Sequence, residues 1–271
     1  MKKFIVFTDL DGTLLDSKTY SFEEALPALA LLKEKNIPLI LCSSKTRAEV
    51  EHWRTLLENE DPFICENGGG VFIPKGYFAF DSGYPAEDAG DYILLRLGAS
   101  YGHLRKVFKE LVNEGFPVKG FGDMNAEEIS GLTGLSLEES VMAKEREFDE
   151  PFIFAGSEEE KAKLFGAIKK RGLNYTQGRF FHLIGESDKG RAAAILIGLY
   201  KKASGEITTV ALGDGVNDIP MLSLADHPVL VADRSGKYDE RIKVASLILA
   251  PGPGPAGWRM AIMELIGKQF P

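Results

Sequence analysis

Short runs of consecutive apolar residues alternate with longer stretches whose apolar residues recur at helical spacing. The first run, "FIVFT" (residues 4–8), is typical of a strand buried on both faces. Ser21 with Glu24, and Thr46 with Glu49, predict capping boxes that open two helices, and the strand "LILC" lies between those helices. This order of strand, helix and strand predicts parallel strands joined by helical crossovers.

The alternation is interrupted and then resumes, which predicts a domain inserted into another. We predict a first core segment over residues 1–83, an inserted α+β domain over 84–186, and a second core segment over 187–271. The fold class expected is α/β, with a doubly wound, Rossmann-like parallel sheet as the core. The strand "DYILLRLG" is assigned to the insert, and "APGPGPAGW" is interpreted as a stiff connection to a final helix over 258–266.

Composition narrows the classes of function. The chain has 271 residues, 44% of them hydrophobic, a formal net charge of -8 and a pI near 5.2. An acidic surface repels phosphates, so we expect no nucleic-acid partner and no anionic membrane partner. Acids interrupt the apolar N-terminal run too early for a secretory signal. Two cysteines, Cys42 and Cys65, fit a reduced, cytoplasmic protein, while the oligomeric state is not predicted.

Acidic residues follow two of the predicted strands. Asp9 and Asp11 come directly after the first run, beside a glycine, and "LGDGVND" supplies Asp214, Asn217 and Asp218 after a later one. Neighbouring carboxylates repel one another unless a cation or a proton neutralises them. Oxygen ligands from two strand ends match Mg²⁺, and the lack of paired His or Cys argues against zinc.

An Asp pair with Mg²⁺ suggests phosphoryl transfer, with a carboxylate as the nucleophile. Phosphate needs hydrogen-bond donors, for which "CSSK" supplies Ser43, Ser44 and Lys45 at the end of another strand. It also needs a cation, and Lys189 stands at a predicted helix start. Taken alone, the serines are more typical of a helix cap, and Lys189 is more typical of a solvated surface lysine.

Along the chain come four motifs: the Asp9–Asp11 pair, the serine of "CSSK", Lys189 and "GDGVND". This order defines the haloacid dehalogenase superfamily, which the sequence resembles over nearly its whole length. The insert resembles that superfamily's type-two cap, of the C2B kind found in sugar phosphatases. The resemblance implies that Asp9 is the nucleophile and Asp11 the general acid/base. It also implies that Ser43 and Lys189 bind the phosphoryl group.

The same resemblance implies a metal site. Mg²⁺ would be held by Asp9, by the backbone carbonyl of Asp11 and by Asp214, while Asn217 and Asp218 would orient metal-bound waters. The cofactor expected is therefore Mg²⁺.

Further stretches resemble the mannosyl-3-phosphoglycerate phosphatase family. They are "SSKT" in place of the frequent Thr-Gly-Arg, "ENGGG", "KGFGDM", "LTGLSLEES", "REFDEPF", "GRFFHL" and "GPAGW". The resemblance implies hydrolysis of mannosyl-3-phosphoglycerate to mannosylglycerate and phosphate. The alternatives are another capped phosphatase (for glucosyl-3-phosphoglycerate, sucrose phosphate or a hexose phosphate), a phosphomannomutase-like enzyme, or a non-catalytic module that binds a phosphorylated metabolite.

A substrate with a carboxylate, a phosphate and a sugar needs cations and hydrogen-bond donors. We expect Arg179 to bind the carboxylate or the sugar, and His182 either to bind substrate or to be structural. Because the two are three residues apart, a regular strand would point them to opposite faces. The turn at Asn67 and Gly68 either places backbone amides near the substrate or is a simple tight turn. Ser44 and Lys45 are also expected to bind the substrate. Arg146 is expected on a solvated helical face.

Overall fold

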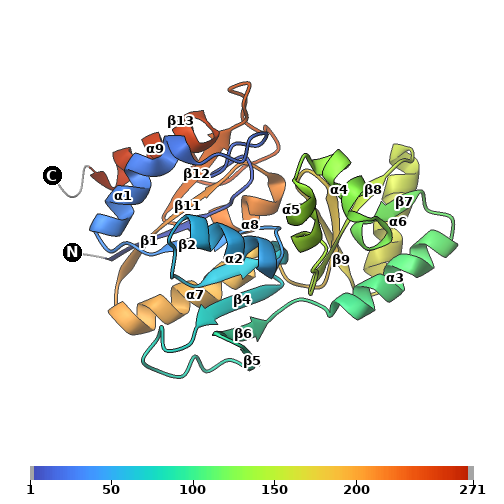
Figure 1. The fold of residues 1–271 in the computed structure, drawn as a ribbon, viewed down its shortest axis with the longest axis horizontal. Helices are drawn as coiled ribbons and strands as arrows, with labels where there is room; N and C mark the ends of the chain where they lie inside the picture. Colours follow the sequence, from blue (N-terminus) through green and yellow to red (C-terminus); the bar gives the residue numbers. More distant parts are fainter. Residues whose placement is uncertain (1–2, 268–271) are drawn as a thin grey trace.

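The computed structural model describes residues 3–267, and its main feature is a nine-stranded sheet (Figure 1). Among the described residues, no helix combines the length and apolar character needed to cross a membrane. The strands of the sheet, in spatial order, are β13 (Ile248–Pro253), β12 (His227–Ala232), β11 (Ile207–Gly213), β1 (Lys3–Thr8), β2 (Leu39–Cys42), β3 (Phe63–Cys65), β4 (Gly70–Pro74), β6 (Tyr92–Arg96) and β5 (Glu87–Ala89).

The six strands from β13 to β3 are parallel, as the sequence predicts, and the remaining three pair antiparallel at one edge. Parallel neighbours bring their carboxyl ends to the same edge of the sheet, where ligands bind in folds of this kind. The carboxyl ends of β1, β2 and β11 therefore lie side by side.

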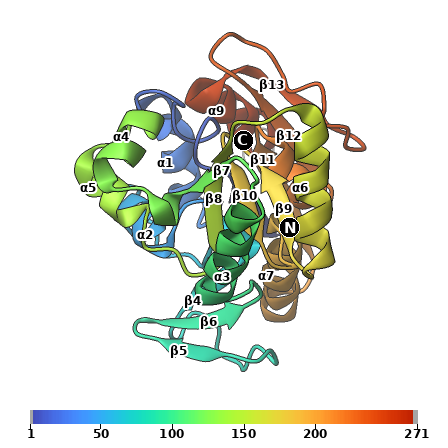
Figure 2. The same ribbon diagram turned by 90° about the vertical axis from the view of Figure 1, so that its right-hand side faces the viewer.

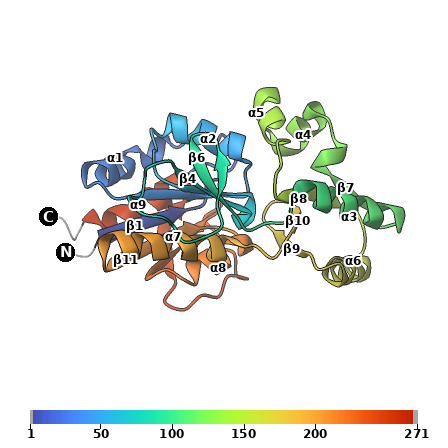
Figure 3. The ribbon, with the colours of Figure 1, turned by 90° about the horizontal axis from the view of Figure 1, so that it is seen from below.

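Helices cover both faces of the large sheet (Figure 3). Phe4 and Val6 of β1 pack in one apolar cluster with α1, α2 and α9, whereas Ile5 and Phe7 pack in a second cluster with α7 and α8. The alternation follows from the two-residue period of a strand. These helices are α1 (Leu26–Glu34), α2 (Arg47–Leu56), α7 (Lys189–Ser204), α8 (Ile219–Leu222) and α9 (Gly254–Leu265).

The insert has its own four-stranded antiparallel sheet, in the order β7, β8, β10, β9. One face packs on α3 and α6, while α4 lies over the other (Figure 2). The elements of the insert are α3 (Tyr101–Asn113), β7 (Val118–Gly120), α4 (Ala126–Thr133), α5 (Leu137–Met142), β8 (Asp149–Phe154), α6 (Glu158–Lys170), β9 (Asn174–Gln177) and β10 (Phe181–Ile184). Short 3-10 turns complete the chain: η1 (Glu23–Ala25), η2 (Glu66–Gly68), η3 (Phe121–Asp123) and η4 (Val216–Asp218).

The strand predicted at "DYILLRLG" exists as β6, but it pairs with β4 in the large sheet and not with strands of the insert. The assignment to the insert is wrong because sequence proximity to α3 does not reveal the antiparallel β4–β6 pairing. The division of the chain at residues 84 and 186 stays a prediction.

Two local predictions are also wrong. Ser21 and Glu24 form no capping box, since α1 begins later, at Leu26, after the turn η1. The connection expected at "APGPGPAGW" is instead regular structure: residues 250–253 belong to β13 and residues 254–258 begin α9. The pairing of β13 with β12 shifts register between Leu230 and Ala232. The Thr46–Glu49 capping box is confirmed.

Candidate active site

Three aspartates converge at the carboxyl edge of the large sheet. Asp9 follows β1, Asp214 follows β11, and Asp218 ends the turn η4. Each offers a carboxylate oxygen within 4.8 Å of the other two. Asp9 is 6% exposed and Asp218 is fully buried, so bulk water screens their mutual repulsion poorly.

Lys189 supplies the cation that lies between two of these acids. Its Nζ is 2.5 Å from Oδ1 of Asp9 and 2.6 Å from Oδ1 of Asp218, and its side chain is completely buried. The other oxygen of Asp218 accepts hydrogen bonds from the backbone N–H groups of Asp214 and Gly215. Both oxygens of Asp218 are therefore engaged, whereas Asp9 and Asp214 keep lone pairs for another ligand.

The acids repel one another despite this lysine. Burial raises the pKa of Asp9 to about 7, with Lys189 opposing the shift and Asp218 adding to it. Burial also raises the pKa of Asp214 well above its usual range, and the charges of Asp9 and Asp218 raise it further. Although burial opposes it, the neighbouring acids raise the pKa of Lys189, so this side chain stays charged. Three carboxylates face one lysine, so the cluster favours taking up either protons or a cation.

The backbone around this cluster fits a hard metal ion. Gly12 has φ +83°, and a Cβ at this position would lie 2.5 Å from Oδ2 of Asp214, so only glycine leaves that oxygen accessible. Thr13 donates to the other oxygen of Asp214 at 3.1 Å. In addition, Oδ1 of Asp11 is buried and has no hydrogen-bond partner in the described structure. The donor set is entirely oxygen, which Mg²⁺ prefers.

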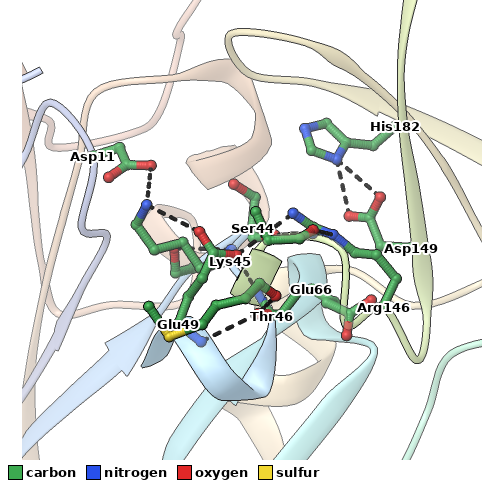
Figure 4. Close-up of polar contacts among 12 residues, drawn as sticks. Asp11, Ser44, Lys45, Thr46, Glu49, Glu66, Arg146, Asp149 and His182 are labelled. Atoms are coloured by element: carbon green, nitrogen blue, oxygen red, sulfur yellow. Dashed lines mark hydrogen bonds and ion pairs between the residues drawn. The ribbon is translucent and has the colours of Figure 1, made fainter. Parts of the chain in front are cut away.

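Asp11 is held by a second buried lysine (Figure 4). Nζ of Lys45 lies 3.0 Å from Oδ2 of Asp11 and 3.4 Å from Oε1 of Glu49, on the first turn of α2. Although burial opposes it, the charges of Asp11 and Glu49 raise the pKa of Lys45 above its usual value. Lys45 is therefore held by two ion pairs and also lines the cavity, and its contact with the substrate stays a prediction.

Arg146 from the insert completes this network. Its guanidinium lies 3.6 Å from Glu49 and donates to the backbone carbonyl of Ser44 at 2.8 Å, and its side chain is 5% exposed (Figure 4). The solvated position expected for Arg146 is wrong, because the segment between α5 and β8 folds back onto the core. Phe148 of the same segment is fully buried in the core cluster.

A cavity of about 1010 Å³ lies between the insert and the carboxyl edge of the large sheet. Predicted site residues that line it are Asp9, Asp11, Ser44, Lys45, Arg179, His182, Asp214 and Asn217. The remaining predicted site residues do not line the cavity and are buried: Ser43, Asn67, Gly68, Lys189 and Asp218. Ser43 is buried beside the cavity, and its Oγ accepts a hydrogen bond from the Lys45 backbone at 3.2 Å.

Arg179 and His182 both line the cavity, so the opposite faces of one regular strand do not describe this pair. The reason is that Arg179 lies in the turn before β10, where strand alternation does not apply. Its guanidinium donates to the backbone carbonyls of Leu132 and Thr133, at 2.8 and 2.7 Å. Arg179 therefore fixes the end of α4 beside the cavity.

Asn67 and Gly68 lie in the turn η2, next to the start of α7. Both have positive φ, and a Cβ on Gly68 would lie 2.1 Å from the carbonyl oxygen of Asp188. The glycine therefore permits close packing of two backbones. Asn67 uses its side chain instead: its Nδ2 donates to Asp149 at 2.7 Å, and its Oδ1 accepts from Asn217 at 3.1 Å.

Sequence reasoning missed Glu49 and Asp149 as neighbours of the site. Glu49 was identified only through its capping box, a signal that says nothing of ion pairs. Asp149 opens β8, and its carboxylate lies 2.9 Å from Nδ1 of His182. Also missed were Asp233, Lys237 and Arg241 of the loop after β12, which line the cavity opposite the insert and carry no motif.

Known proteins resemble this chain closely. The haloacid dehalogenase-like hydrolase family matches residues 6–96. A glucosyl-3-phosphoglycerate/mannosyl-3-phosphoglycerate phosphatase of Methanococcoides burtonii is 47% identical over 268 residues, covering 98% of each chain. A mannosyl-3-phosphoglycerate phosphatase of Pyrococcus furiosus is 39% identical over 88% of this chain and 95% of its own length.

Solved structures share the fold at lower identity. A sugar phosphatase of HAD subclass IIB superposes with a TM-score of 0.65 at 17% identity, covering 98% of this chain and 99% of its own. A protein of Thermoplasma acidophilum gives a TM-score of 0.69 at 18% identity, covering 97% and 98%. With relatives 39–47% identical over most of their length, the chain belongs to the mannosyl-3-phosphoglycerate phosphatase family of haloacid dehalogenase-like hydrolases.

Proposed function

We propose that this protein is a Mg²⁺-dependent phosphatase that hydrolyses mannosyl-3-phosphoglycerate to mannosylglycerate and phosphate. The observation that carries the proposal is the 47% identity, over 98% of the chain, to a phosphatase named for this ester. That relative is also named for glucosyl-3-phosphoglycerate, which makes the glucosyl ester the second candidate substrate. The paired strand-end acids Asp9 and Asp11, with Lys189 beside Asp9, support a phosphoryl-transfer chemistry.

In the proposed first step, a carboxylate oxygen of Asp9 attacks phosphorus, and the bond from phosphorus to the glycerate oxygen breaks. Asp11 gives its proton to that departing oxygen. In the second step Asp11 takes a proton from a water molecule, which attacks the aspartyl-phosphate and releases inorganic phosphate and free Asp9. Ser43 and Lys189 hold the phosphoryl oxygens in both steps.

Mg²⁺ bound by Asp9, the backbone carbonyl of Asp11 and Asp214 would neutralise charge that develops on the phosphoryl oxygens. Asn217 and Asp218 are proposed to orient its water ligands. The grouping of three carboxylates around one lysine and the glycine at position 12 support this site. We place the protein in the cytoplasm, for which its two buried free cysteines are the support.

The test is phosphate release in the presence of Mg²⁺ from mannosyl-3-phosphoglycerate, glucosyl-3-phosphoglycerate, 3-phosphoglycerate and hexose phosphates. We expect turnover of the two glycosyl esters, and loss of it in Asp9→Asn. Asp16→Asn is the matched control, because this acid follows the same motif but bonds to Lys18 and Thr19 outside the acidic cluster. Equal turnover of hexose phosphates would refute the narrow substrate, and no hydrolysis of any ester would favour a binding module.

A further inference from the structure

One chain of hydrogen bonds runs from the wall of the cavity to the loop that carries Asp214. Nδ1 of His182 lies 2.9 Å from both carboxylate oxygens of Asp149. Figure 4 shows the ring turned toward this carboxylate. Oδ2 of Asp149 accepts from Nδ2 of Asn67 at 2.7 Å, and Oδ1 of Asn67 accepts from Nδ2 of Asn217 at 3.1 Å. The four side chains come from β10, β8, η2 and η4, so these hydrogen bonds join the insert to the core.

The carboxylate of Asp149 sets the direction of every bond in this series. An ionised carboxylate only accepts, so the Nδ1 atom of His182 must carry a hydrogen. The same carboxylate requires Asn67 to present its amide N–H₂, which turns the carbonyl oxygen of Asn67 toward Asn217. In the tautomer that carries its hydrogen on Nδ1, Nε2 of His182 is an acceptor, and His182 lines the cavity.

Burial makes this arrangement costly for the fold. Asp149 is completely buried, Asn67 is 1% exposed and His182 is 4% exposed. Within the described part of the chain, the Asp149 carboxylate has His182 and Asn67 as hydrogen-bond partners and forms no salt bridge with a lysine or arginine, although the buried Arg146 interacts with it electrostatically at longer range. A buried acid without a paired cation lowers the stability of a fold.

We propose that Asp149 is a positioning residue of the reaction. It fixes the imidazole of His182, so that Nε2 accepts a hydrogen bond from a substrate hydroxyl, and it fixes Asn67 against Asn217 beside the metal site. This assignment rests on the proposed phosphatase function. It gives His182 a role in substrate binding through a partner that lies outside the cavity.

The test compares Asp149→Asn with Glu150→Gln. Glu150 is the next residue of β8 and is also completely buried, but its carboxylate bonds to Arg105 and Gly122 inside the insert. Both variants replace one buried carboxylate by an amide in the same strand. Only the Asp149→Asn substitution alters the hydrogen bonds to His182 and Asn67, because an amide cannot accept from both donors through the same two atoms.

The first measurement is ¹⁵N NMR of the histidine rings in the substrate-free protein. The chain has four histidines, and a His182→Gln variant assigns the resonance of interest. We expect wild-type His182 to be protonated at Nδ1, and Asp149→Asn to change its tautomer while Glu150→Gln does not. A wild-type ring with bare Nδ1, or an unchanged tautomer in Asp149→Asn, would overturn the proposal. This readout needs no substrate, so it separates the failure of this assignment from a failure of the proposed function.

The second measurement is steady-state hydrolysis of mannosyl-3-phosphoglycerate with Mg²⁺. Asp149→Asn should lower kcat/KM by roughly 10- to 100-fold, the range typical of lost outer-shell partners, and should raise KM. Glu150→Gln should leave kcat/KM unchanged. Equal losses in the two variants would reduce Asp149 to a structural role and contradict the proposal.

Discussion

The ammonium group of Lys45 lies 3.0 Å from Oδ2 of Asp11, and both residues line the cavity. Because Asp11 is the proposed proton donor, Lys45 would fix the direction in which its carboxylate points. We predict that Lys45→Met lowers kcat for mannosyl-3-phosphoglycerate by about 10²-fold, the loss typical of a misplaced catalytic group. KM should change less.

The control for this prediction is Lys33→Met, which removes a lysine paired with Glu58 on the surface. It should leave kcat unchanged. A Lys45→Met variant with normal kcat and a raised KM would instead assign Lys45 to substrate binding.

The ion pair between Arg146 and Glu49 is buried, with both side chains 5% exposed. Removing one partner leaves an uncompensated charge, so Arg146→Met should lower the free energy of unfolding by about 3–5 kcal/mol. Arg241→Met removes a partner from an exposed pair with Asp239 and should cost about 0–1 kcal/mol. Urea unfolding at neutral pH measures both. Equal effects would show that Arg146 does not lock the insert onto the core.

The carboxylate of Glu66 makes stability depend on pH. Burial raises its pKa to about 8, although Arg146 and the backbone N–H groups of Glu147 and Phe148 oppose the shift. An acid whose pKa is higher in the folded state binds its proton more tightly there. Its contribution to stability is therefore complete below the ordinary pKa of glutamate, 4.5, and is lost as pH rises through about 8.

Glu66→Gln should remove this dependence. We expect the difference in Tm between the wild type and Glu66→Gln to move in favour of the variant as pH rises from about 4.5 to about 8. Thermal unfolding at several pH values within this range measures it. A constant difference would mean that Glu66 binds its proton equally in the folded and unfolded states.

Gly68 packs against the backbone at the start of α7, and this contact is open to a simple test. Its φ is +86°, and an added Cβ would lie 2.1 Å from the carbonyl oxygen of Asp188. Gly76→Ala is the control, since its φ is +81° with nothing within 4 Å. Gly76→Ala should cost about 1–2 kcal/mol of unfolding free energy from backbone strain alone.

Gly68→Ala should cost more than its control, because overpacking adds about 1–3 kcal/mol to the strain. It should also lower activity, since Lys189 follows Asp188 directly. Chemical denaturation and phosphate release measure the two effects. Equal stability in the two variants would mean that the turn moves freely away from α7.

The acidic cluster could be predicted from the sequence because it depends on which residues directly follow each strand. An apolar run followed by an acid predicts a buried strand and its carboxyl end, and parallel strands place such ends together. The proximity of Asp9 and Asp214 follows from that topology, although the two are 205 positions apart in the sequence. Lys189 was identified in the same way, from its place at a helix start.

The contacts of the insert could not be predicted in this way. Arg146 reaches Glu49, and Asp149 reaches Asn67, because the segment between α5 and β8 folds back onto the core. No periodic pattern of apolar residues predicts that this segment packs against the core. Arg179 shows the same limit: its spacing from His182 suggested one regular strand, whereas a turn places it on the carbonyls that end α4.

The most direct test of the account is to identify the aspartate that becomes phosphorylated. Acid quenching during turnover of mannosyl-3-phosphoglycerate, followed by borohydride reduction, converts an aspartyl-phosphate to homoserine. Mass spectrometry of the tryptic peptide over residues 4–18, which contains Asp9, Asp11 and Asp16, locates it. The account predicts homoserine at position 9 alone. Homoserine at position 11, or an unmodified peptide from an enzyme that is turning over, would contradict it.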